Sequence, residues 1–281
     1  MTKPITIVTA VLQNQKPNDG KRPRPEQREE LLRRIVHQYG KADIILLPAG
    51  FYQTHGHLTV KREEKEVGEM TKTIQGILNK EKSDAAVCFG FDSDKDQLAF
   101  AVNKTGLQAA ARKFYHPKSR FALADDFNGE ELGKKRTFEI RGKTFYLAVC
   151  FDVKALGKRI KGAEKKPNGV DAVLSLIHIF GKSINKEGVE RGQGFSYFIR
   201  TIAGASLQWG VPVFASATFY KWNGAKFPSG ILCKKAYYKN GCDSDLKNLK
   251  NDKVRLDKAV REGELVEAEP ESAICKEYVL E

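Results

Sequence analysis

The sequence predicts a layered α/β fold of the α+β kind, and three observations lead to that expectation. Short apolar runs alternate with longer amphipathic segments along all 281 residues. The runs form both hairpins and strand–helix–strand units, which favours a layered sandwich over a doubly wound parallel sheet. Neither an internal repeat nor a low-complexity linker interrupts the pattern. We therefore expect one domain spanning residues 1–281, which is long enough to bury a substantial core.

In the first half of the chain, strands are expected at residues 4–12, 43–47, 85–90, 97–103 and 108–115. The run at 43–47 is apolar throughout, as in a strand that is covered on both faces. The polar turn at 92–96 joins two of the runs into a hairpin. Helices are expected at 25–39, which opens on Pro25, and at 62–81, because the apolar residues of both recur at helical spacing.

The second half continues the alternation. Strands are expected at residues 136–140, 144–150, 170–180, 211–214, 229–237 and 265–269. A long helix is expected over residues 187–209, where Gly210 then ends the segment.

A formal net charge of +13 is the one unusual bulk property. The basic residues gather at 16–24, 134–141, 154–166 and 234–258. Such charge attracts polyanions, so a nucleic-acid partner is one alternative. The sequence lacks helix-turn-helix or zinc-finger spacing and any interleaving of aromatic with basic residues, which favours solvated loops and helix faces instead.

The apolar composition of 41% and charged composition of 30% are typical of a soluble globular protein. No apolar run approaches the roughly 20 residues that a membrane-spanning helix needs, so no membrane partner is expected. The first residues lack the features of a signal peptide, and a cytoplasmic location is the expectation.

Five scattered cysteines and the missing export signal predict reduced thiols rather than a disulfide framework. His55 and His57 are the only local pair of metal-ligand type, and no third ligand lies nearby in sequence. We expect loop histidines and no metal site.

Three segments, in order, resemble the nitrilase superfamily of carbon–nitrogen hydrolases. Residues 43–51 (DIILLPAGF) form a buried strand that runs into proline, residues 115–121 (YHPKSRF) hold a lysine after an aromatic residue, and residues 142–152 (GKTFYLAVCFD) end a strand on Cys-Phe-Asp. The later segments 169–176, 210–214, 227–231 and 263–269 follow the family's order as well. The resemblance covers roughly residues 4 to 270.

Membership of this family would imply a four-layer αββα sandwich, a homodimer, and neither cofactor nor metal. It would also imply hydrolysis of a small amide or nitrile through a thioester on Cys150. Lys118 and the backbone N–H of Phe151 would then stabilise the oxyanion. The family's general-base glutamate would fall at residue 49, where this sequence has Ala49.

A methyl group cannot take a proton from a thiol or activate water, and loss of a positioned general base typically slows a reaction about 10²–10⁴-fold. Asp126 stands about eight residues after Lys118, where some relatives carry a second carboxylate. We weigh Asp126 as a surrogate base against the alternative of a solvated turn beside Asp125. Asp152 is expected to be structural.

Two functions of this site therefore stay open, besides the binding of a polyanion through the basic surface. The first is a hydrolase whose activity is weak or lost because the base is missing. The second is a non-catalytic protein of the same fold that binds a small ligand or a protein partner. A natural loss and an engineered substitution both fit Ala49.

Overall fold

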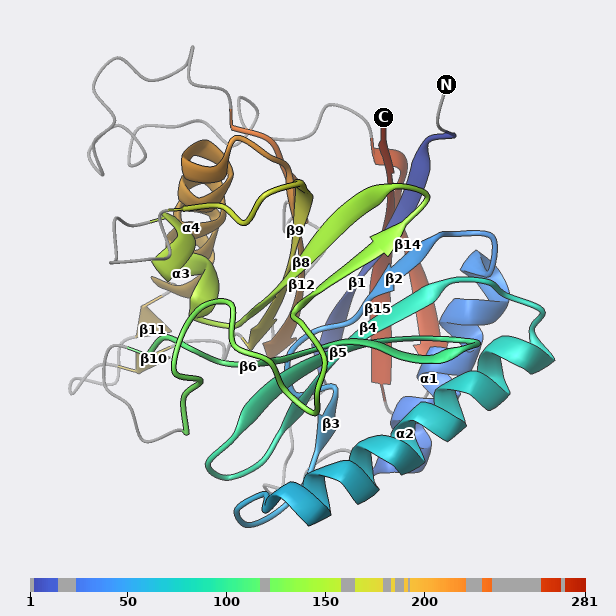
Figure 1. Ribbon diagram of the computed structural model, residues 1–281. Helices are drawn as coiled ribbons and strands as arrows, with labels where there is room; N and C mark the ends of the chain where they lie inside the picture. Colours follow the sequence, from blue (N-terminus) through green and yellow to red (C-terminus); the bar gives the residue numbers. More distant parts are fainter. Residues whose placement is uncertain are drawn as a thin grey trace.

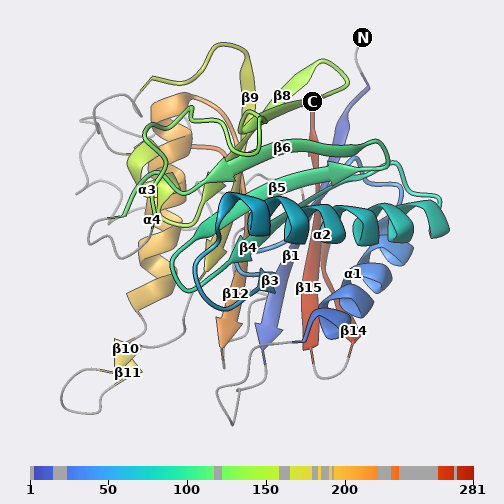
Figure 2. The same cartoon turned by 60° about the horizontal axis from the view of Figure 1, so that its bottom comes forward.

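The computed structural model describes residues 3–14, 24–116, 122–157, 165–178, 183–184, 190–191, 193–220, 229–233, 259–268 and 271–281. Within these ranges the helices lie on two opposite sides of a block of strands (Figures 1 and 2). Helices α1 (Pro25–Tyr39) and α2 (Val60–Lys80) form one outer layer. Helices α3 (Asp152–Gly157) and α4 (Gln193–Trp209) form the other.

Thirteen of the described strands belong to one sheet, whose main path runs β6-β5-β4-β2-β1-β12-β9-β8-β7. The strands of this path are β6 (Gly106–Arg112), β5 (Gln97–Asn103), β4 (Ala86–Asp92), β2 (Ile44–Leu46), β1 (Ile5–Asn14), β12 (Val213–Tyr220), β9 (Val170–His178), β8 (Lys143–Val149) and β7 (Thr137–Ile140). Off the path lie β3 (Tyr52–Gln53), β13 (Gly230–Ile231), β14 (Ala259–Ala268) and β15 (Glu271–Leu280). A separate short pair joins β10 (Ser183–Ile184) to β11 (Glu190–Arg191).

Strand β1 joins the two halves of the sheet. Its residues 7–9 pair in parallel with β2, and residues 12–14 pair in parallel with β12. Along its other edge, β1 pairs antiparallel with β15 over the whole range 5–14. The halves therefore diverge from β1, and β5 and β6 come to lie against β8.

Three apolar clusters show that the fold has four layers. One cluster packs α1 and α2 against the half of the sheet that holds β2, β4 and β5. A second packs α3 and α4 against the half that holds β8, β9 and β12. The third lies between the two half-sheets and joins side chains from both. The expected αββα sandwich is thus confirmed, because each half-sheet buries one face on helices and the other on its partner.

Most of the expected elements of the first half are present within a few residues of their predicted bounds. The second half needs corrections. The helix expected over 187–209 begins only at Gln193, because Glu190–Arg191 pairs with Ser183–Ile184 as a strand. The strand expected at 211–214 extends to Tyr220. Of the strand expected at 229–237, the described residues 229–233 contain only the short strand Gly230–Ile231, and residues 234–237 lie outside the described residues.

The closing strand β15 was not predicted at all. Residues 271–280 pair with β1 on one side and with β14 on the other, so β15 is an interior strand. Helix α3 and strand β3 were also missed, and both are short.

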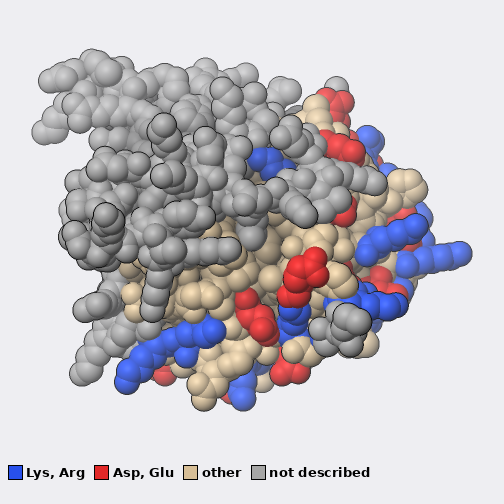
Figure 3. Space-filling view, turned by 90° about the horizontal axis from the view of Figure 1, so that it is seen from above, with Lys and Arg blue, Asp and Glu red and all other residues tan. Residues whose placement is uncertain are grey.

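The basic segments at 16–24, 154–166 and 234–258 lie largely outside the described residues. On the described part of the face in Figure 3, Lys and Arg side chains are interspersed with Asp and Glu. Among the described residues no helix combines the length and the apolar character needed to cross a membrane.

Candidate active site

The strand directions bring three chain segments to one edge of the sandwich. Strands β2, β6 and β8 all run the same way, as the pairings from β6 through β1 to β8 require. Their carboxyl ends therefore lie at the same edge, where the chain continues into Ala49, Lys113 and Cys150. Residues at such strand ends commonly carry function because the sheet fixes their backbone.

Cys150 occupies a strained turn between β8 and α3. Its φ of 50° lies in the left-handed region, which a residue with a side chain adopts at a cost of about 1–3 kcal/mol. The Cys150 N–H donates to the carbonyl of Leu176 on β9 at 2.7 Å, which holds the turn in place. The side chain is buried and forms no disulfide. Because Cys150 lies in this turn and not in β8, the backbone of the turn sets the direction of its side chain. The alternation of side chains along the strand does not.

Asp152 anchors this turn from inside the protein, as expected for a structural role. Its carboxylate accepts the N–H of Val149 at 3.2 Å and the N–H groups of Phe114 and Tyr115 at 2.9 and 3.0 Å. It also pairs with Arg136 at 3.1 Å, and both side chains are buried. Asp152 thereby ties the Cys150 turn to the segment that follows β6.

Lys113 is the residue of this region that the sequence did not single out. It is only 1% exposed, its Nζ donates to Oε1 of Gln97, and the same Nζ lies 5.2 Å from the centre of the Phe151 ring. An ammonium over an aromatic face is a favourable cation–π contact. Its position directly after a strand could have marked Lys113 as a candidate. The sequence, however, predicted a strand that continues to residue 115, so Lys113 was expected within that strand. Lys118, the lysine that was expected to stabilise the oxyanion, lies outside the described residues.

His116 also lies beside Phe151. The two rings are 5.2 Å apart and nearly perpendicular. Phe151, the residue whose backbone N–H the resemblance assigns to the oxyanion, thus contacts both Lys113 and His116 on the segment after β6.

Ala49 lies in the same apolar cluster as Cys150, between the half-sheets, and is fully buried. The two residues before it are held by β4, since Leu47 N–H donates to the carbonyl of Cys88 and Gly90 N–H donates to the carbonyl of Pro48. A Cβ on Gly90 would lie 2.3 Å from the Ala49 Cα, so only glycine fits on β4 at this point. The position is therefore rigid, and its side chain is a methyl group.

Asp126, the candidate surrogate base, lies on an exposed turn between β6 and β7. Its carboxylate accepts the backbone N–H of Asn128 at 2.6 Å, as in an Asx turn. Burial raises the pKa of Tyr146, and the charge of Asp126 adds to that rise. Tyr146 packs on Trp209 of α4, whereas Cys150 belongs to the cluster between the half-sheets. The role of Asp126 as a base stays a prediction.

The described histidines before α2 lie near carboxylates. His57 Nδ1 lies 3.1 Å from Asp96, and His55 Nδ1 lies 4.0 Å from Asp94. Within the described ranges, no three His, Cys, Asp or Glu side chains are grouped so as to hold a metal ion.

No protein-family model and no curated protein matches the chain. Among solved structures, the chain is similar to mutants of the amidase from Nesterenkonia sp. AN1. One shows the result of Michael addition of acrylamide at the active-site cysteine; it is 14% identical, with 76% of this chain and 78% of that chain covered and a TM-score of 0.47. Another, with the acetamide moiety of fluoroacetamide added covalently at that cysteine, is 12% identical over 76% of each chain, with a TM-score of 0.48. A third mutant, of this amidase from the nitrilase superfamily, is 15% identical over 78% of each chain, with a TM-score of 0.47.

Proposed function

We propose that this chain is a nitrilase-type carbon–nitrogen hydrolase whose nucleophile is Cys150 and whose turnover is slow because residue 49 is alanine. The observation that carries the proposal is the strained Cys150 turn at the end of β8, beside a ring that a buried lysine covers. The order of sequence motifs over almost the whole chain supports the same class of reaction.

In the proposed reaction the Cys150 sulfur attacks the carbonyl carbon of a small amide. The carbon–nitrogen bond then breaks, the amine leaves with a proton, and a thioester remains on Cys150. Water next attacks the thioester, the acid leaves, and the thiol is restored. A nitrile would enter through attack on its carbon and would form a thioimidate first.

The proposed oxyanion stabilisers are the ammonium of Lys113 and the backbone N–H of Phe151. A fixed cation and a fixed N–H donor act where negative charge develops in the transition state, and this is often the largest single contribution to catalysis. Lys113 takes this role in place of Lys118, because Lys113 has a direct contact with Phe151.

The missing general base would slow the hydrolysis of the thioester more than its formation. Thiols are a few per cent ionised at pH 7 and can attack without help, whereas water needs a base to attack a thioester efficiently. The fully buried methyl of Ala49 cannot serve as that base. We therefore expect the acyl group to accumulate on Cys150.

The test is to incubate the protein with an activated acyl ester such as p-nitrophenyl acetate and to follow both p-nitrophenol release and the intact mass. We expect a burst of one equivalent, a mass increase that peptide mapping assigns to Cys150, and slow turnover afterwards. The Cys150→Ala variant should lose the burst, whereas Cys88→Ala, which removes another thiol of the same apolar cluster, should keep it. Absence of a burst in the unaltered protein, or a burst that survives Cys150→Ala, would refute the proposal.

Ala49 also favours a second candidate, a protein that binds a small amide or carboxylate without converting it. In that case the ligand should raise the melting temperature of the unaltered protein and of Cys150→Ala alike, and no acyl adduct should form.

A further inference from the structure

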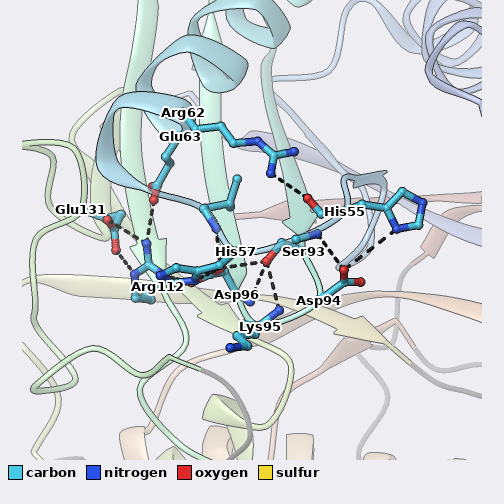
Figure 4. A network of polar contacts seen from close by, with 12 residues as sticks. His55, His57, Arg62, Glu63, Ser93, Asp94, Lys95, Asp96, Arg112 and Glu131 are labelled. Atoms are coloured by element: carbon cyan, nitrogen blue, oxygen red, sulfur yellow. Dashed lines mark hydrogen bonds and ion pairs between the residues drawn. The ribbon is translucent and has the colours of Figure 1, made fainter.

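A largely buried cluster of charges surrounds Arg112, the last residue of β6. Its guanidinium binds Glu63 of α2 at 2.6 Å, Asp96 of the β4–β5 turn at 2.5 Å, and Glu131 of the β6–β7 connection at 2.6 Å. Figure 4 shows Arg112 with Glu131 and Glu63 on one side and Asp96, His57 and Ser93 on the other. A different nitrogen of the planar guanidinium binds each carboxylate: Nη2 binds Glu63, Nη1 binds Asp96 and Nε binds Glu131. The single nitrogen of a lysine could not reproduce this planar arrangement.

This Arg112 cluster lies on the opposite face of the strand pair from the candidate active site. Arg112 pairs with Leu98, and residues paired in this way share a face, which here is the face covered by α2. Lys113 follows Arg112 and so lies on the inner face, together with Gln97, which follows Asp96. At the start of β5 and at the end of β6, a residue of the cluster is thus followed directly by a residue of the Lys113–Gln97 pair.

Backbone hydrogen bonds join the two faces into one unit. Lys113 N–H donates to the carbonyl of Gln97 at 2.9 Å, and Ala124 N–H donates to the carbonyl of Lys113 at 2.9 Å. Asp96 also accepts the backbone N–H of Leu58 at 3.1 Å and the hydroxyl of Ser93 at 2.8 Å. A shift of the Arg112 side chain would therefore move the backbone that carries Lys113.

The balance of charge makes the cluster dependent on Arg112. Three carboxylates, with His57 beside Asp96, face a single guanidinium. Burial, with the nearby Glu131, raises the pKa of Glu63 to about 7 despite the opposing effect of Arg112. Removal of Arg112 would leave buried carboxylates without a cation, which is strongly unfavourable.

We propose that Arg112 is a positioning residue, which Glu63, Asp96 and Glu131 hold so that Lys113 stays over the Phe151 ring at the Cys150 site. This inference rests on the proposed function, because it gives Lys113 a task at Cys150.

The test measures the alkylation rate of Cys150 by iodoacetamide against pH, which yields the pKa of the thiol. The Lys113→Met variant comes first: loss of its cation should raise the thiol pKa and slow alkylation at pH 7 about three- to tenfold. Arg112→Gln should change the profile in the same direction, and the double variant should be no slower than Lys113→Met alone, since both changes act through one group. Arg62→Gln, which alters an arginine on α2 that binds Glu66 and Thr54, is the matched control and should match the unaltered protein.

A second variant distinguishes the positioning of Lys113 from a direct effect of the cluster's charge on the Cys150 thiol. It can also be used if Arg112→Gln fails to fold. Glu131→Gln removes a negative charge, so a direct effect would lower the thiol pKa and speed alkylation. If Arg112 positions Lys113, the result should be the opposite. Arg112 loses a charged partner in Glu131→Gln, so alkylation should be slower. Faster or unchanged alkylation in Glu131→Gln, or additive effects of Arg112→Gln and Lys113→Met, would overturn the inference. If Lys113→Met itself leaves the profile unchanged, the proposed role of Lys113 fails instead.

Discussion

At residue 49 the protein places a methyl group on a backbone that pairing with β4 holds rigidly. The side chain is buried in the apolar cluster between the half-sheets, to which Cys150 also belongs. The resemblance of the sequence to a known family already assigned Cys150, Phe151 and Ala49 to one site, and an apolar run precedes each of the two segments that hold them. It could not identify Lys113, because the choice between two lysines depends on where β6 ends.

Ala49→Glu should restore the missing base. We expect hydrolysis of simple amides to rise about 10²–10⁴-fold, with the larger effect on release of the acyl group. Ala49→Gln is the control, because it has a nearly identical shape without a basic carboxylate. Both variants place a polar group in a buried apolar position, so their melting temperatures should fall together. Equal rates for the two variants, with both folded, would show that residue 49 does not lie at a catalytic position.

At the scale of elements, the strands and helices with strong periodicity were predictable, and those that depend on distant partners were not. Residues 25–39 and 97–103 were expected with the bounds that the structure has. Strand β15 was missed, because its interior place follows from pairing with β1 at the other end of the chain. The start of α4 was misplaced because residues 190–191 pair with residues 183–184 rather than continue a helix.

The same substitution at two glycines tests how the strands and helices pack. Gly90→Ala on β4 would bring a Cβ within 2.3 Å of the Ala49 Cα, so we expect destabilisation of about 1–3 kcal/mol. Gly68→Ala on α2 meets no atom within 4 Å, and alanine should stabilise the helix by up to about 1 kcal/mol. Urea denaturation measures both changes. Equal effects of the two substitutions would contradict the packing of β4 against the segment after β2.

For the molecule as a whole, buried carboxyl groups should make stability depend on pH. The pKa of Glu63 is raised to about 7, mainly by burial, and burial also raises the pKa values of Glu29, Asp152 and Glu271. A group with a raised folded-state pKa binds its proton more tightly in the folded protein. Its contribution to the free energy of unfolding is therefore complete below about pH 4.5 and is lost as the pH rises towards 7.

Glu63→Gln should flatten this dependence. The variant cannot release a proton at this position, so the free energy of unfolding should fall less between pH 4.5 and pH 7, by an amount on the order of a few kcal/mol. Glu64→Gln, on the exposed side of α2, should keep the full slope. Denaturation curves at several pH values measure the slopes, and parallel slopes for Glu63→Gln and the unaltered protein would rule out this role of Glu63.

The relative alkylation rates of the cysteines in the folded protein give the sharpest test of whether Cys150 is the nucleophile of an enzyme-like site. A Cys242→Ser background removes the thiol that lies outside the described residues. Burial raises the pKa values of Cys88 and Cys275, so both should react very slowly with iodoacetamide. We expect peptide mapping to find Cys150 modified at least about tenfold faster than either of them. Modification of Cys150 no faster than that of Cys88 or Cys275 would contradict its role as the nucleophile.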